Sequence, residues 1–244
     1  MARNRLRALG LSFVVALGLL ALGAGSAQAA NEFLLLHPVG KTFGEEKVAE
    51  ATFTGTIESP AFSFTTPGVG EAYELTCLGV TVTGKVLPAV LHAKMIFENC
   101  RTYYVSKFMT HYYLLNMGKL HPCTVLEQSF EAKLKAVPVL HNKETFLLWE
   151  ALEKGKPFAK VFYGGIGCPW TSVDFTGTVV STLVQLNVAE QLVSFSPWTT
   201  LLFQEAGLPG DKLLHNGEQE TFVEGSLFKL LLTGASLDKP WGAH

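Results

Sequence analysis

Residues 80–86 read VTVTGKV, and this stretch decides the fold. Its valines and glycine occupy the even positions, and its threonines and lysine occupy the odd positions. The same period-2 alternation recurs in residues 51–57, 130–136 and 173–179. Strict alternation of this kind is typical of a strand with one buried face and one wetted face. It predicts about ten to fourteen strands and at most one or two short helices; residues 142–153 could form either a helix or a strand.

Turn signals separate these runs, among them Pro67-Gly68, Gly164-Gly165 and Asn216-Gly217. Antiparallel strands with one wetted face pack as a sandwich or close into a barrel. We therefore expect an all-β fold, either an antiparallel β-sandwich or a barrel-like domain with disulfides.

A short motif repeats within the strand pattern: apolar, Thr, Gly, polar, apolar. Its copies centre on Gly55, Gly84 and Gly177, with a looser one at Gly225. A glycine on an apolar strand face leaves a notch for a large ring or a neighbouring backbone, or it marks a bulge. The copies are either equivalent strands of two pseudo-repeated halves, around 30–140 and 141–244, or chance strings in a β protein.

The chain opens with three arginines, an apolar stretch from about Leu9 to Leu22, and Ala27-Gln28-Ala29. These parts, in this order, are typical of a secretory signal peptide that is cleaved after Ala29. The sequence thus predicts a signal peptide at 1–29 and a single secreted, extracellular β domain at 30–244. After cleavage no apolar run is long enough for a membrane-spanning helix. The alternative is an uncleaved anchor.

All four cysteines lie in the exported part, at Cys77, Cys100, Cys123 and Cys168. An even count in an oxidising compartment predicts two disulfides, and the absence of a CxxC motif argues against zinc. Four cysteines allow three pairings. We expect Cys100–Cys123, which would close a local loop, and hence Cys77–Cys168.

The order of these features resembles a known group of sequences. A strand with a cysteine (ELTCLGVTVTGKV, 74–86) precedes Phe97-x-x-Cys100, Pro122-Cys-Thr124, GGIGCPWTSVDFTGTVV (164–180) and WTTLLF (198–203). This order is similar to that of uncharacterised secreted, cysteine-containing β proteins of high-GC Gram-positive bacteria, over roughly residues 50–240. The chain departs from the pattern between Cys100 and Cys123, where it is longer and more aromatic. The family has no assigned activity, so the resemblance implies bacterial origin, secretion and a β fold.

The motifs of catalysis are missing from the sequence. It has no GxSxG or HExxH, and its GGIG is followed by no helix that could cradle a phosphate. The best acid–base cluster, His215 with Glu218 and Glu220, is better explained as a solvated hairpin turn. Carboxylates could meet across strands, for example Glu74 with Glu98 or Glu131 with Glu150. We expect no catalytic residue, no metal site and no cofactor.

Residues 103–113, YYVSKFMTHYY, hold four of the six tyrosines: Tyr103, Tyr104, Tyr112 and Tyr113. Exposed tyrosine rings suit sugar or protein surfaces, although paired aromatics also stabilise a hairpin. The formal net charge of −2 argues against nucleic acid as a partner. The sequence favours a non-enzymatic domain that binds a cell-envelope component, a glycan or a protein. The alternatives are a secreted hydrolase of carbohydrates or esters, and a structural subunit that assembles through strand edges.

Overall fold

The structure is a computed structural model, and the residues that it describes fall into separate ranges along the chain. They are 33–39, 42–47, 50–57, 62–67, 71–106, 119–142, 144–184, 190–196, 199, 203–204, 212–234 and 241–243. The predicted signal peptide, residues 1–29, lies outside the described residues.

The described chain is built from strands, as predicted. In chain order they are β1 (Phe33–Val39), β2 (Thr42–Lys47), β3 (Ala51–Ile57), β4 (Phe62–Thr66), β5 (Glu71–Val86), β6 (Leu91–Ser106), β7 (Lys119–Leu120), β8 (Thr124–Val125), β9 (Ser129–His141), β10 (Glu144–Ala151), β11 (Ala159–Gly164), β12 (Ser172–Val184), β13 (Glu190–Phe195), β14 (Leu213–His215), β15 (Gln219–Thr233) and β16 (Trp241–Ala243). A 3-10 turn, η1 (Leu126–Gln128), lies between β8 and β9. The ambiguous segment 142–153 contains strand β10. The strands outnumber the expectation because β7 and β8 have two residues each.

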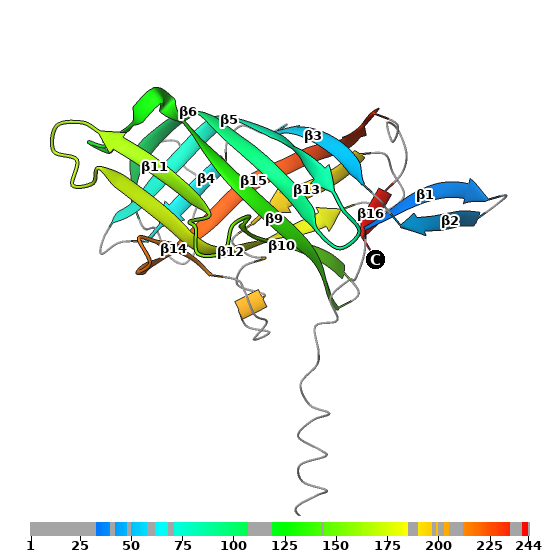
Figure 1. Ribbon diagram of the computed structural model, residues 1–244. Coiled ribbons are helices and arrows are strands. Elements are labelled where there is room, and N and C mark those ends of the chain that lie inside the picture. The colour runs from blue at the N-terminus through cyan, green and yellow to red at the C-terminus, as the bar shows by residue number, and fades with distance from the viewer. Residues whose placement is uncertain are drawn as a thin grey trace, which may run out of the picture.

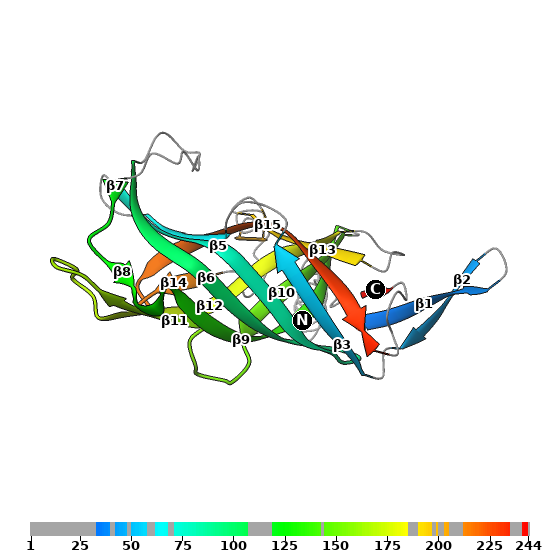
Figure 2. The same cartoon turned by 90° about the horizontal axis from the view of Figure 1, so that it is seen from above.

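The strands close into an antiparallel barrel, which decides between the two predicted architectures. The ring runs β10-β9-β6-β5-β3-β15-β13-β12, and β12 pairs back to β10. At one end of the barrel, β4 pairs with β5 and β15, and β14 pairs with β12 and β15. There, β11 extends the sheet from β12, and β8 pairs with β11. A separate sheet, β16-β1-β2, lies at the opposite end, where β1 and β2 extend away from the barrel (Figures 1 and 2).

One buried hydrogen bond spans the seam where β10 meets β12. Leu147 lies opposite Ser181 in the register, and Trp149 lies opposite Val179. The indole Nε1 of Trp149 donates to Ser181 Oγ at 2.8 Å, and both side chains are buried. A buried hydroxyl and indole satisfied in this way favour this register over a slipped one.

Phenylalanine rings fill the barrel interior. Phe62 lies 5.1 Å from Phe97 and 5.4 Å from Phe195, measured between ring centroids. Phe64 stacks on Phe175 at 4.8 Å, and Phe97 stacks on Phe130 at 4.5 Å. Each of these six rings is at most 9% exposed. The interior of the described barrel is therefore a packed aromatic core.

The repeated glycines form the predicted notches. A Cβ on Gly84 would lie 2.0 Å from the carbonyl oxygen of His92 and 2.8 Å from the ring of Phe53. A Cβ on Gly225 would lie 2.2 Å from the ring of Phe62. Real Cβ atoms do not approach so closely, so these glycines let rings pack against the backbone.

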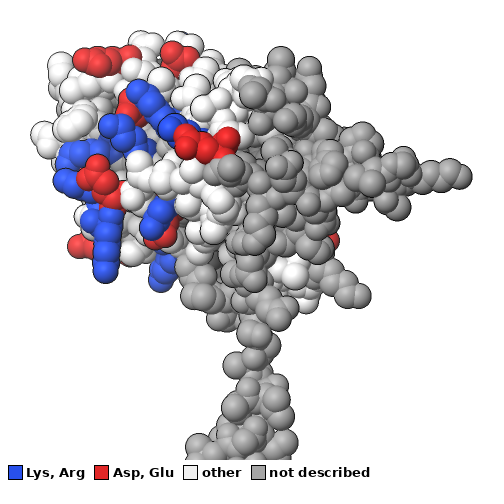
Figure 3. Space-filling view, turned by 45° about the vertical axis from the view of Figure 1, so that its right-hand side comes forward, with Lys and Arg blue, Asp and Glu red and all other residues white. Residues whose placement is uncertain are grey.

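Charged side chains of both signs are interspersed on part of the described surface (Figure 3). Lysines of β5, β6 and β9 form ion pairs with glutamates nearby: Lys85–Glu50 at 2.6 Å, Lys94–Glu131 at 2.6 Å and Lys135–Glu150 at 3.0 Å. These exposed pairs add little stability, but they keep this face polar. Glu131 and Glu150 are thus occupied by lysines and do not form a carboxylate pair.

Candidate functional site

The two disulfides differ from the predicted pairing. Cys77 is bonded to Cys100, and Cys123 is bonded to Cys168. Strands β5 and β6 form one long antiparallel hairpin whose register places Cys77 directly opposite Cys100. The prediction was wrong because it weighed loop size alone, whereas the pairing is set by register. The turn at residues 87–90, equidistant from both cysteines, is the sequence signal that would have revealed it.

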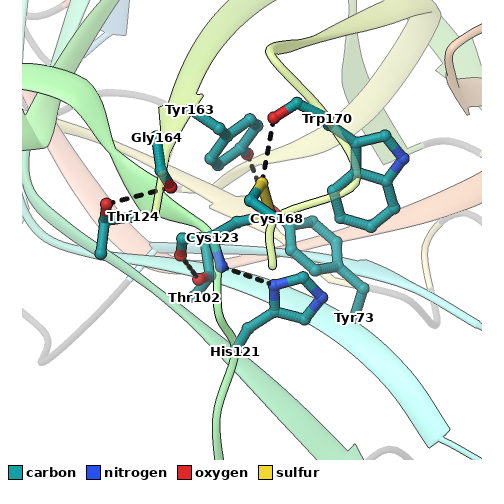
Figure 4. Close-up of a disulfide and its surroundings, with 9 residues drawn as sticks. All are labelled: Tyr73, Thr102, His121, Cys123, Thr124, Tyr163, Gly164, Cys168 and Trp170. Carbon is teal, nitrogen blue, oxygen red and sulfur yellow. Dashed lines mark hydrogen bonds between the residues drawn. A yellow bond between two sulfur atoms is a disulfide. The ribbon is translucent and has the colours of Figure 1, made fainter. Parts of the chain in front are cut away.

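The Cys123–Cys168 bond ties together two segments that lie far apart in the sequence. Cys123 precedes β8, and Cys168 lies in the turn between β11 and β12. Around it, Thr124 Oγ1 donates to the carbonyl of Gly164 at 3.1 Å, and Thr102 Oγ1 donates to the carbonyl of Cys123 (Figure 4). Cys168 Sγ lies 3.0 Å from the carbonyl oxygen of Trp170; this is a sulfur–oxygen contact, because a disulfide sulfur carries no hydrogen.

Gly165 allows this junction to close. Its φ is +116°, a conformation that disfavours residues with a side chain, and its added Cβ would lie 2.2 Å from the carbonyl oxygen of Pro122. The GGIG segment is therefore a tight turn against Pro122 that leads to Cys168, as the sequence indicated.

Beneath the disulfide lies a group of rings that we call the ring cluster. Its members come from four strands and two connecting segments and are Tyr73, Tyr104, His121, Tyr163, Trp170 and His215. Tyr73 is central, with its centroid 5.1 Å from those of both His121 and Trp170 and 5.8 Å from that of His215. His121 stacks parallel to Trp170 and lies 4.3 Å from Tyr104. Figure 4 shows Tyr73, His121, Tyr163 and Trp170 around the disulfide.

Burial sets the ionisation of the ring cluster. A hydrogen bond joins the hydroxyls of Tyr73 and Tyr163, and burial raises the pKa of both phenols. Burial lowers the pKa of both His121 and His215, so both imidazoles are neutral near pH 7. His121 Nδ1 accepts from the backbone N–H of Cys123 at 3.1 Å. The buried imidazoles and phenols of the ring cluster are thus uncharged near pH 7, and the cluster packs beside the Cys123–Cys168 disulfide.

His215 does not join the carboxylates that follow it in the sequence. Its side chain is 4% exposed and faces Tyr73, while Glu218 is exposed in the turn between β14 and β15. Asn216, with φ of 51°, links that turn to β12, because its side-chain oxygen accepts a hydrogen bond from the backbone N–H of Asp174 at 2.9 Å. The predicted hairpin is present, since β14 pairs with β15 across this turn, but His215 itself is buried and not solvated. Among the described residues no group of three or more His, Cys, Asp or Glu side chains is placed to hold a metal.

The predicted tyrosine site is only partly described. Tyr103 and Tyr104 lie on β6 and point to opposite faces, with Tyr104 in the ring cluster and Tyr103 paired across the sheet with Glu74. Both are half-buried. Tyr112 and Tyr113 lie outside the described residues, so their role as a recognition surface stays a prediction.

Sequence reasoning missed an exposed group that we call the apolar tip: Leu126, Phe162 and Ile166. Their exposed fractions are 51%, 53% and 102%, and among the described residues one other large apolar side chain, Leu78 on β5, is comparably exposed at 59%. Leu126 Cδ2 would lie 3.1 Å from a Cβ on Gly164, so Leu126 covers the strand position between Phe162 and Ile166. The alternation of side chains along the strand could have revealed this group. Burial alternates along β11, and Phe162 occupies an outward-facing position.

No protein-family model, curated protein or solved structure matches the chain. The resemblance to secreted bacterial proteins thus stays a prediction. The described residues contain no helix with the length and apolar character needed to cross a bilayer.

Proposed function

We propose that this protein is an exported, non-enzymatic recognition domain that binds a partner protein through the apolar tip. The observation that carries the proposal is the exposure of Leu126, Phe162 and Ile166 on one disulfide-anchored corner. Exposed apolar side chains that adjoin one another mark interaction sites more often than isolated ones do.

The anchoring of the tip favours a binding role. Ile166 lies two residues before Cys168, and the carbonyl of Gly164 accepts a hydrogen bond from the side chain of Thr124, the neighbour of Cys123. A loop held in its binding conformation loses less conformational entropy when a partner docks. The same disulfide supports a location outside the reducing cytosol.

The chemistry of the tip favours a protein over a glycan. Sugars stack on flat, exposed Trp and Tyr rings, whereas Leu126 and Ile166 are aliphatic. Lys160 lies 5.6 Å from the ring centroid of Phe162 and forms an ion pair with Asp174 at 3.1 Å. An apolar centre with charges of both signs at its rim suits a protein surface. A small molecule inside the described barrel is disfavoured, since phenylalanine rings fill it.

Site-specific photo-crosslinking in the producing cells tests this function. A photoreactive residue at Ile166 should give one discrete crosslinked protein, and Phe162→Ser should abolish that product. The matched control places the probe at Lys154, an exposed loop residue away from the tip. The captured protein, once purified, should bind the wild type at least tenfold more tightly than Ile166→Ser, equivalent to about 1.4 kcal/mol.

Three results would overturn the proposal. Equal crosslinking from positions 154 and 166 would mean that the apolar tip does not bind a specific partner. Undiminished binding by Ile166→Ser would place the interface elsewhere. Crosslinking of the chain to itself alone would replace recognition by assembly.

A further inference from the structure

The outward face of β4 is buried although its side chains are polar. Ser63 and Thr65 point away from the phenylalanine core, yet they are 1% and 7% exposed. On β5, Glu74 lies opposite Thr65 and is 6% exposed. On the other side of β4, Glu224 of β15 lies opposite Ser63. Two glutamates thus straddle the five-residue strand on one face, and we call them the carboxyl pair.

No cation neutralises the carboxyl pair within the described residues. Glu74 Oε1 accepts a hydrogen bond from Thr76 Oγ1 at 2.5 Å, and Glu224 has no ion pair. Between the two carboxyls lies Ser63, whose buried hydroxyl has no hydrogen-bond partner. When both glutamates are ionised, their negative charges are therefore separated by uncharged hydroxyls alone among the described residues.

Among the described residues, four other titratable groups lie on the neighbouring strands or just before them. On β6, Tyr103 lies opposite Glu74, and the exposed Arg101 lies opposite Thr76. On β15, Glu220 accepts from Gln204 Nε2. Lys212, just before β14, is exposed.

We propose that Glu74 and Glu224 form a proton-operated latch that holds β4 between β5 and β15 in acid and loosens it as the pH rises. Burial raises the pKa of Glu74, and burial together with repulsion from Glu74 raises the pKa of Glu224. A carboxyl pKa that is higher in the folded state than in the unfolded state contributes stability below the unfolded value, near 4.3. That stability is lost as the pH rises through the folded values.

Hydrogen exchange at β4 measures the latch directly. In the wild type, after correction for intrinsic exchange, the opening equilibrium of the Ser63, Phe64 and Thr65 amides should rise with pH. The rise should be up to about tenfold per pH unit for each proton released. Glu74→Gln and Glu224→Gln mimic the protonated state, and each should flatten the profile. Melting temperature is the poorer readout, because His121 and His215 respond to acid in the opposite direction.

Glu131→Gln is the matched control. Glu131 lies on β9 and is held by Lys94, which lowers its pKa, so its removal should leave the β4 profile unchanged. A wild-type profile without pH dependence would overturn the latch, whatever the folding of the variants. So would a wild-type slope in both glutamine variants. Suppression of β4 opening by calcium ions at high pH, lost in Glu74→Gln, would also overturn it and assign the pair to a cation.

Discussion

Removing the Cys123–Cys168 bond should destabilise the protein and disable the apolar tip together. The bond closes a loop with a sequence separation of 45, and Cys77–Cys100 closes one of 23. Loop-closure entropy then gives about 4.0 kcal/mol for the first bond and about 3.4 kcal/mol for the second at 25 °C. At about 2–4 °C per kcal/mol for a domain of this size, Cys123→Ala/Cys168→Ala should melt about 8–16 °C below the wild type.

The two bonds differ more in function than in stability. The Cys77–Cys100 bond joins strands that are already paired along most of their length. The Cys123–Cys168 bond holds a turn beside the two-residue strand β8. Loss of the second bond should therefore weaken partner binding, while Cys77→Ala/Cys100→Ala should bind normally below its melting temperature.

Urea denaturation and non-reducing peptide mapping check this reasoning. Because the two loops are consecutive and do not overlap, their effects on the free energy of unfolding should add within about 0.5 kcal/mol. Reduction of the wild type is the control, since it breaks both bonds without removing a buried sulfur. A loss below about 1 kcal/mol for Cys123→Ala/Cys168→Ala would refute the entropic argument, and a Cys100–Cys123 peptide would refute the pairing.

Two further outcomes concern the core. Gly84→Ala should cost more than about 2 kcal/mol, since its methyl would collide with the backbone at His92 and the ring of Phe53; a thermal melt like that of the wild type would contradict the notch. Tyr163→Phe should cost about 1–3 kcal/mol by leaving the buried Tyr73 hydroxyl unpaired. In the wild type, absorbance titration should find these two phenols un-ionised at a pH where exposed tyrosines titrate, and their ionisation with the others would contradict their burial.

Local patterns predicted much of the fold because they report on one strand at a time. The alternation in VTVTGKV distinguishes its buried face from its wetted face without reference to any other strand. The glycine of that motif likewise anticipated a close approach by a ring. Neither pattern could say which ring, since Phe53 reaches Gly84 from β3 only after β3 and β5 pair.

The candidate site was harder to predict because its parts come from separate strands. The apolar tip joins Leu126 to Phe162, and the ring cluster joins Tyr73 to His215 across most of the chain. The carboxyl pair was missed for the same reason: Glu74 was considered with Glu98, but β4 inserts between β5 and β15 and brings Glu224 to its face.

The sequence by itself determined that the chain forms antiparallel strands with one apolar face, and that four cysteines suffice for two disulfides. Strand alternation and composition are local properties, so they survive without knowledge of the tertiary structure. Barrel closure, the cysteine partners, the apolar tip and the carboxyl pair depend on register between strands distant in the sequence. Register is fixed only when all the inward side chains pack together. For that reason only the tertiary structure decided these four features.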